Sequence, residues 1–377
     1  MPNGAAQPLK EIFDRPLVEA LAARVAAVYP GFAAEAMVAA VLTDFAGLAL
    51  MARVGRIAEG LQTFLPPHFP AAVVILLAAL GEDDGSGGVE GHAGFRYLPL
   101  LHFVGRYGLA HPQLALDALA EMTRYFSAEF AIRPYILHHP ELTLPRLQQW
   151  AEDADWRLRR LASEGSRPRL PWGVRLQPFI DNPEVCLAII EPLFAESHPV
   201  VRRSVANHLN DVAKDHPKRV LTTARRWLAQ GDANSRWMVR HALRTLIKQG
   251  DGDALALLGF SGSQPPEVVA FSLGPAEVKL GEAVTFTATL RCRQPARLCI
   301  DYRIHHQRHN GTLSPKVFKL STRQVVADTL VQLEKHHTLR LITTRRYYPG
   351  EHRLELLVNG TILCGGSFVL VMPCERQ

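Results

Sequence analysis

The sequence predicts a mostly α-helical repeat domain followed by a small all-β domain, and three observations support this fold class. A template of alternating basic and apolar residues recurs at 156–162, 199–206 and 237–243. It brings Arg159, Arg202 and Arg240 into register at spacings of 43 and 38 residues, within the period of HEAT and armadillo repeats. After residue 261 short β-branched runs replace the helical pattern. The expected architecture is a HEAT-like helical-repeat solenoid followed by a β-sandwich.

Residues 10–81 have the apolar periodicity of amphipathic helices. Apolar residues recur at spacings of three and four, which places them on one face of each helix. Pro30-Gly31 and the Leu-Pro-Pro-His segment at 65–68 interrupt the pattern and are expected to end helices. The periodic positions are Leu17, Leu21, Val25 and Val28 in the first element, and Val38, Leu42, Phe45 and Leu48 in the next.

The middle of the chain continues the helical pattern after one flexible segment. The acidic, glycine-rich stretch 81–88 predicts a loop. Helices are expected to resume over 98–128 and to form a pair over 134–150. The three template helices follow and end near residue 260, which gives roughly six stacked helix pairs, enough for neighbours to bury one another's apolar faces. We therefore expect a first domain over residues 1–260.

Residues 261–377 are expected to form the β-sandwich. Seven short strands separated by Gly, Pro and Asn turns are typical of an immunoglobulin-like (Ig-like) domain. The segment has no tryptophan, so the antibody-type core signature is absent. The expected strands are 268–273, 283–291, 296–305, 314–320, 337–342, 352–358 and 367–371.

The distribution of charge points to an anionic partner. The whole chain has a formal net charge of +6, which is weak evidence by itself. Residues 156–250, however, carry 17 basic and 8 acidic residues, a net charge of +9, whereas residues 1–155 are acidic overall. Because the basic residues recur in register with the repeat, a phosphate-binding stripe is favoured over an ordinary solvated face.

Other classes of site find little support. The five cysteines have no metal-ligand spacing and indicate a reduced, cytoplasmic protein with buried thiols. Histidines at 305–309 and 336–337 have no Cys or carboxylate at a tetrahedral spacing, so no metal and no cofactor are expected. The apolar run 71–80 is too short to span a bilayer, and the N-terminus lacks a secretion signal. No membrane role is expected.

Acidic residues inside the basic segment call for a reason other than phosphate binding. Glu164 stands one helical turn after Arg160 and is followed by a proline-bounded turn that ends at Trp172. An i,i+4 ion pair is the simplest interpretation of Arg160 and Glu164. Asp211 follows in the second template helix, and Glu129 precedes the basic repeats. An aromatic residue beside a carboxylate and arginines on a rigid loop is also a candidate ligand-binding cluster.

Several of these runs together resemble a known family. They are Glu-Phe-Ala-Ile-Arg-Pro at 129–134, Arg-Arg-Leu-Ala-Ser-Glu-Gly at 159–165, Arg-Pro-Arg-Leu-Pro-Trp at 167–172 and the C-terminal runs at 302–306, 310–311 and 314–318. In combination they are similar to the AlkC branch of the HEAT-like-repeat alkylpurine DNA glycosylases. The resemblance covers nearly the whole chain, including the Ig-like domain.

The resemblance implies a DNA glycosylase of base excision repair. Such a hydrolase would cleave the N-glycosidic bond of cationic alkylated bases, chiefly 3-methyladenine and 3-methylcytosine, in double-stranded DNA without base flipping. Carried over by position, Glu129, Glu164 and Asp211 are the expected catalytic carboxylates, and Arg160 and Trp172 the substrate-binding residues. A carboxylate can stabilise an oxocarbenium-like cation and activate water. A monomer in the bacterial cytosol or nucleoid, with no obligate protein partner, is expected.

The remaining basic residues are assigned to the DNA backbone, where contacts are independent of base sequence. The sequence leaves open which arginines reach phosphate, which carboxylate activates water, whether the Ig-like loop enters a groove, and which alkylated base is preferred. Two alternatives lack catalysis: a helical-repeat scaffold for an acidic protein, and a DNA-damage binding protein. The expected DNA-binding residues are Arg167, Arg169, Arg202, Arg203, Arg240, Arg308, Asn310 and Lys316.

Overall fold

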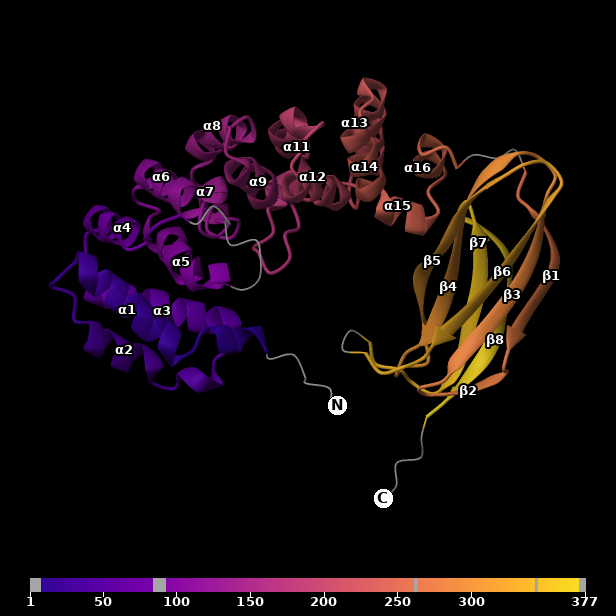
Figure 1. Cartoon of the computed structure of the whole chain (residues 1–377), viewed down its shortest axis with the longest axis horizontal. Coiled ribbons are helices and arrows are strands. Elements are labelled where there is room, and N and C mark those ends of the chain that lie inside the picture. Colours follow the sequence, from indigo (N-terminus) through magenta and orange to yellow (C-terminus); the bar gives the residue numbers. More distant parts are fainter. Residues whose placement is uncertain (1–7, 84–92, 261–263, 343–344, 373–377) are drawn as a thin grey trace, which may run out of the picture. The chain divides into compact units, whose positions relative to one another are not determined.

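The computed structural model describes residues 8–83, 93–260, 264–342 and 345–372. The chain divides into two compact units, which we call the helical unit and the sandwich unit (Figure 1). The helical unit is formed by Met1–His216 with Arg226–Ala242, and the sandwich unit by Pro217–Arg225 with Leu243–Gln377. The domain boundary at residue 260 stays a prediction.

Sixteen α-helices precede the strands in the described part of the chain. The helices expected over 10–81, 98–128 and 134–150 are present, with breaks at Pro30-Gly31 and at 65–68. Of the loop expected at 81–88, residues 84–88 lie outside the described residues. The helices are α1 (Arg15–Val28), α2 (Ala34–Leu42), α3 (Leu50–Phe64), α4 (Phe69–Ala78), α5 (Leu98–Tyr107), α6 (Pro112–Met122), α7 (Arg133–His138), α8 (Pro140–Ala151), α9 (Trp156–Gly165), α10 (Gln177–Asp181), α11 (Glu184–Ile190), α12 (Pro199–Val212), α13 (Pro217–Gln230), α14 (Ala233–Ala242), α15 (Arg244–Gln249) and α16 (Gly252–Leu257).

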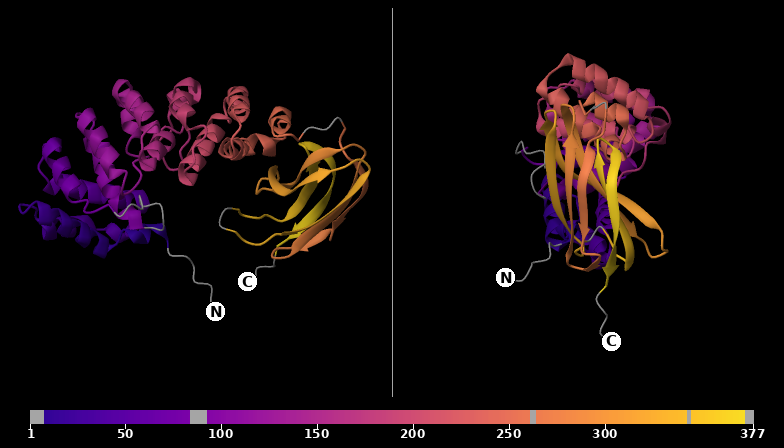
Figure 2. Two further views of the ribbon diagram at one scale, coloured as in Figure 1. Left: turned by 45° about the horizontal axis from the view of Figure 1, so that its top comes forward. Right: turned by 90° about the vertical axis from the view of Figure 1, so that its right-hand side faces the viewer.

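The three template segments form helices α9, α12 and α14. The side chain of Asp155 caps the first of them by accepting a hydrogen bond from the Arg157 amide at 2.9 Å. Pro199 begins α12, where its missing N–H costs no helical hydrogen bond. Helix α12 packs against α9 on one side and α14 on the other, so the templates are neighbours in space (Figure 2). Their assignment to HEAT repeats stays a prediction.

The strands form two packed sheets. One sheet has the order β1-β3-β6 and the other β2-β8-β7-β4-β5, and every pairing is antiparallel except β2 with β8. Buried Phe286 and Tyr302 lie in the core between them. The strands are β1 (Glu267–Gly274), β2 (Glu277–Lys279), β3 (Ala283–Cys292), β4 (Ala296–Gln307), β5 (Leu313–Val325), β6 (Thr329–Thr338), β7 (Gly350–Val358) and β8 (Thr361–Val371).

The structure confirms the predicted fold class, with two differences in the strands. The described residues form eight strands, because the three-residue β2 is too short to leave a sequence pattern. The strand expected at 337–342 is mostly wrong, since β6 spans Thr329–Thr338 and ends just after that segment begins. Val331 and Leu333 are buried in β6 while Leu330 is exposed, so the alternation that marks this strand lies upstream of the predicted one.

No single helix within the described ranges is long and apolar enough to cross a membrane. One helix pair, Leu50–Phe64 with Phe69–Ala78, passes the same criteria of length and composition only when both are taken together, and it is bent by 114°.

Candidate active site

The first carboxylate of the candidate site belongs to Glu129, in the turn that precedes α7. Its Oε2 accepts a hydrogen bond from Nη1 of Arg160 at 2.7 Å, and the same nitrogen donates to Oγ of Ser127 at 2.6 Å. Arg160 therefore pairs with a residue 31 positions away. The i,i+4 pair with Glu164, suggested by sequence spacing, is not the ion pair that forms.

Glu164 lies in the last turn of α9 and is buried. Oε1 accepts a hydrogen bond from Nη1 of Arg167 at 2.6 Å, and Oε2 accepts one from the hydroxyl of Ser204 on α12. Burial raises the pKa of this carboxyl, but the charges of Arg160 and Arg167 and the Ser204 hydrogen bond outweigh that effect. The net pKa lies below the usual value, so Glu164 is ionised at neutral pH.

Asp211 is the third carboxylate and lies on α12, almost fully buried. Its Oδ2 is 2.8 Å from both Nε and Nη2 of Arg167, and its Oδ1 accepts from Lys214 at 2.9 Å. Arg167 thus lies between Asp211 and Glu164 and joins α12 to the end of α9. We call Glu129, Glu164 and Asp211, with Arg160 and Arg167, the carboxylate cluster.

Trp172 projects from the loop between α9 and α10. Its side chain is 71% exposed and its φ is 65°, in the left-handed region that non-glycine residues rarely adopt. Backbone hydrogen bonds from Gly173 to Leu170 at 3.1 Å and from Leu176 to Pro168 at 3.1 Å hold the loop in shape. An exposed indole on a strained but braced loop is typical of a ligand-binding position.

A cavity of about 250 Å³ brings these groups together. Its polar lining is Glu129, Glu164 and Arg167, and Trp172 forms part of its wall. Arg160 and Asp211 are not among the lining residues, but each hydrogen-bonds to one that is: Arg160 to Glu129 and Asp211 to Arg167. The other lining residues are apolar: Leu50, Met51, Phe95, Leu98, Phe126, Phe130, Leu170 and Pro171. The ionised Glu164 carboxylate beside an aromatic wall, in surroundings of low polarity, favours a bound cation.

The predicted phosphate-binding arginines of the helical unit differ in whether their guanidinium groups already have partners. Arg169 pairs with Asp215 through two hydrogen bonds, and Arg202 lies over the Trp237 ring at 5.1 Å. Arg203 and Arg240 are exposed and make no ion pair or hydrogen bond with any residue that the structure describes. Only the second pair keeps its guanidinium groups available to an anion. Arg167, by contrast, is buried in the carboxylate cluster.

The predicted residues of the sandwich unit lie in the turn between β4 and β5 and at the start of β5. Arg308 and Asn310 are exposed in the turn, and Lys316 is exposed on β5. Asn310 accepts hydrogen bonds from the amide and hydroxyl of Thr312, which fixes the turn. Arg308 and Lys316 line a basic cavity of about 170 Å³, to which Arg345 and Arg346 also contribute. Sequence analysis did not identify these two arginines, because they are distant in the chain.

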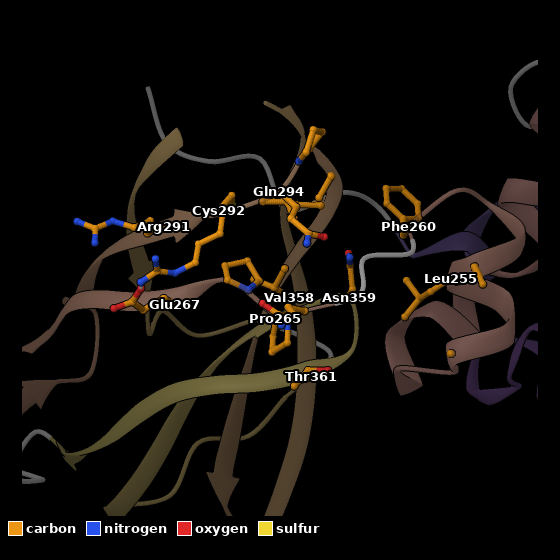
Figure 3. Close-up of a pocket in the computed structure, with 18 residues that line it drawn as sticks. Leu255, Phe260, Pro265, Glu267, Arg291, Cys292, Gln294, Val358, Asn359 and Thr361 are labelled. Carbon is orange, nitrogen blue, oxygen red and sulfur yellow. The ribbon is translucent and has the colours of Figure 1, made fainter. Parts of the chain in front are cut away.

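A larger cavity, of about 400 Å³, lies in the sandwich unit between α16 and the strand ends (Figure 3). Its acidic group, Glu267, is exposed and pairs with Arg293 at 2.8 Å. None of the residues that line this cavity is a buried carboxylate, and none was among the candidate catalytic residues named from the sequence. No cluster of His, Cys, Asp and Glu within the described ranges could hold a metal ion. The carboxylate cluster remains the best candidate for chemistry.

Comparison with known proteins identifies the family. The DNA alkylation repair enzyme family matches residues 122–246, which include all three carboxylates, and the C-terminal Ig-like domain of protein YhaZ matches residues 267–372. The uncharacterized protein YhaZ of Bacillus subtilis is 32% identical over 355 residues, covering 94% of this chain and 97% of that protein. The chain belongs to the DNA alkylation repair enzyme family. This confirms the family and the Ig-like domain that the sequence motifs had indicated.

A solved structure extends the family match to three dimensions. It is the Pseudomonas fluorescens alkylpurine DNA glycosylase AlkC bound to DNA containing an abasic site analog. The two chains are 38% identical and superpose with a TM-score of 0.89, over 96% of this chain and 99% of that one. This family member therefore shares its fold along nearly its whole length with a DNA-bound glycosylase.

Proposed function

We propose that this family member is a DNA glycosylase that releases cationic alkylated bases, such as 3-methyladenine and 3-methylcytosine, from duplex DNA. The observation that carries the proposal is the cavity in which Glu129, Glu164 and Trp172 meet. A cationic base and the sugar cation left by its departure are both attracted to this negative, partly desolvated site. The AlkC similarity supports the same reaction class.

In the proposed reaction the bond between C1′ and the base nitrogen breaks, and its electron pair leaves with the base. A base that carried a positive charge departs neutral, so no general acid is required. The deoxyribose becomes an oxocarbenium-like cation, which a nearby carboxylate stabilises electrostatically. A water molecule then forms the new bond to C1′ and transfers its proton to a carboxylate acting as general base. The damaged nucleotide stays within the helix throughout, as the family resemblance implies.

The hydrogen bonds suggest how the two glutamates divide this work. Both oxygens of Glu164 accept hydrogen bonds, and the side chain is buried, so we assign it to electrostatic stabilisation. Glu129 is partly exposed, and its Oε1 has no hydrogen-bond partner among the described residues. We assign Glu129 to the attacking water. Asp211 holds Arg167, which orients Glu164.

Exposed cations on both units are proposed to hold the DNA backbone. Arg203 and Arg240 in the helical unit, and Arg308 and Lys316 in the sandwich unit, have the exposure that phosphate contacts require. Such contacts are independent of sequence and weaken steeply with salt. They fit a monomer that scans duplex DNA for damage.

The test is release of the free base from duplex DNA that contains 3-methyladenine or, in a parallel reaction, 3-methylcytosine. We expect release well above the spontaneous rate for at least one of the two, and none from an unmodified duplex. Binding to the damaged duplex without release of either base would instead indicate a damage-binding protein. Absence of both binding and release would favour the scaffold alternative.

A further inference from the structure

Arg133 is a buried charged residue that the proposed reaction does not use. It lies in the same short run as Glu129 and begins α7. Its side chain is only 1% exposed, which is rare for an arginine. No carboxylate hydrogen-bonds to it within the described ranges, and its Nη2 is buried without a partner there.

The guanidinium of Arg133 instead binds two backbone carbonyls. Nη1 donates to the carbonyl of Gly165 at 2.8 Å, and Nε donates to the carbonyl of Val174 at 2.6 Å. Gly165 directly follows Glu164, and Val174 stands two residues after Trp172. One side chain therefore connects the segment of Glu129, the end of the helix that carries Glu164, and the loop that carries Trp172.

The segment of Arg133 packs closely against both the end of α9 and the loop that carries Trp172. A Cβ atom at Gly165 would lie 2.6 Å from Cγ2 of Ile132, the residue before Arg133. A Cβ atom at Gly173 would lie 3.3 Å from Nε of Arg133. The helix end and the loop thus approach the Arg133 segment as closely as glycine allows.

The position is electrostatically unfavourable for a cation. Burial and the charge of Arg167 lower the pKa of Arg133, the cluster carboxylates raise it, and the net pKa is about 10. A buried charge with an unpartnered donor contributes poorly to stability. Its geometry gives the better account of why an arginine stands here, since a planar guanidinium donates to the two carbonyls from two separate nitrogens in fixed directions, whereas a lysine would have to reach both from one ammonium nitrogen.

We propose that Arg133 is a positioning residue that sets the relative placement of Glu129, Glu164 and Trp172. It touches neither base nor sugar and acts through the two carbonyls it binds. The inference rests on the proposed function for its effect on excision, but its effect on the Trp172 loop is independent of any activity. Misplacement of reacting groups by about 1 Å can cost on the order of 100-fold in rate.

The test uses Arg133→Lys, with Arg53→Lys as the matched control. Arg53 is also buried and also donates to backbone carbonyls, those of Lys10, Phe13, Ala46 and Leu48. None of these acceptors belongs to a segment that carries a cluster carboxylate or Trp172. Both variants lose a buried fork, and Arg53 pairs in addition with Glu11 at 3.3 Å, so Arg53→Lys controls for the loss of stability that follows from replacing a buried arginine.

Two quantities are measured on the folded protein. The first is the single-turnover rate of base release, together with the dissociation constant for undamaged duplex. The second is acrylamide quenching of Trp172, isolated as the difference between each protein and the same protein carrying Trp172→Phe. For Arg133→Lys we expect release about 10- to 100-fold slower, duplex binding retained, and altered Trp172 quenching. Arg53→Lys is expected to keep the parent values.

Gly173→Ala tests the same contact from the loop side and does not depend on folding of the arginine variant. Its methyl group would lie 3.1 Å from Cδ2 of Leu170 and 3.3 Å from Nε of Arg133, so a smaller change in the same two quantities is expected. Parent-like release and quenching in Arg133→Lys and Gly173→Ala, or equal losses in Arg53→Lys, would overturn the inference. If the parent releases no base, the proposed function fails, and Trp172 quenching alone then decides the role of Arg133.

Discussion

Arginines serve opposite purposes in two regions of this molecule. In the carboxylate cluster, Arg160 and Arg167 are largely buried and each is committed to acidic partners. On the surface, Arg203 and Arg240 are exposed and have no partner among the described residues. The cluster uses its arginines to hold the carboxylates in place and to keep Glu164 ionised, whereas the surface leaves its arginines free for an anion. The same residue type therefore signals either an active site or a binding face, and burial distinguishes them.

The largest effect is expected where the cluster is broken at its centre, with Arg167→Met. Removal of this cation leaves Glu164 and Asp211 without their shared partner in a buried site, and breaking such a pair typically costs about 3–5 kcal/mol. We expect that loss in the free energy of unfolding from urea titration, with loss of base release. Arg169→Met, which breaks the exposed pair with Asp215, is the control and should cost at most about 1 kcal/mol. Similar costs for the two variants would remove the distinction between buried and exposed arginines.

A smaller effect is expected from acid on the sandwich unit, where the histidines His306 and His337 are buried. Burial and the charge of Arg345 lower the pKa of His306 to about 3 and of His337 to about 4. As pH falls below about 6.5, histidines in the unfolded chain become protonated while these two histidines in the folded chain stay neutral. The free energy of unfolding therefore decreases from about pH 6.5 to about pH 4. In His337→Gln this decrease should shrink by about 1–2 kcal/mol in urea titrations at several pH values. An unchanged pH dependence in the variant would contradict the assignment.

The smallest effect is expected from the exposed arginines taken singly. Arg203→Ala or Arg240→Ala should weaken binding to any duplex by a few-fold and reduce the salt slope by about one. The Arg308→Ala and Lys316→Ala changes should act in the same way from the sandwich unit. Arg146→Ala, which removes an arginine paired with Asp117, is the control and should leave the slope unchanged. A change in preference among base sequences, instead of a uniform loss, would contradict backbone binding.

The fold could be predicted from sequence wherever local pattern decides it. Periodic apolar residues with Pro and Gly breaks indicated the helices, and alternation located six of the strands, four of them within two residues of their observed bounds. Strand β5 ends five residues after its predicted end, and β8 begins six residues before its predicted start. Strand β2 has only three residues and pairs with β8, far along the chain, so no local signal exists for it. The strand expected at 337–342 was misplaced, since the alternation of buried and exposed residues lies in β6, Thr329–Thr338, most of which the prediction omitted.

The candidate site was predictable in its members but not in its pairings. Glu129, Glu164 and Trp172 were named from motifs, and the structure brings them to one cavity. Arg167 was assigned to phosphate because sequence shows charge and not burial, and its partner Asp211 lies 44 residues away. Ser204 was overlooked for the same reason, since its contact with Glu164 spans 40 residues. The Glu-Phe-Ala-Ile-Arg-Pro run contained Arg133, but only the folded chain shows what it binds.

The most direct test of the central claim compares Glu164→Gln with Glu196→Gln. Both changes replace a buried, arginine-paired carboxylate by an amide, but Glu196 pairs with Arg159 outside the cavity. Single-turnover base release and duplex binding are measured for each. We expect Glu164→Gln to lose about 100- to 1,000-fold in release while binding is retained, and Glu196→Gln to keep both. Equal losses of release and binding in Glu164→Gln, or equal behaviour of the two variants, would make Glu164 a structural residue and contradict the account.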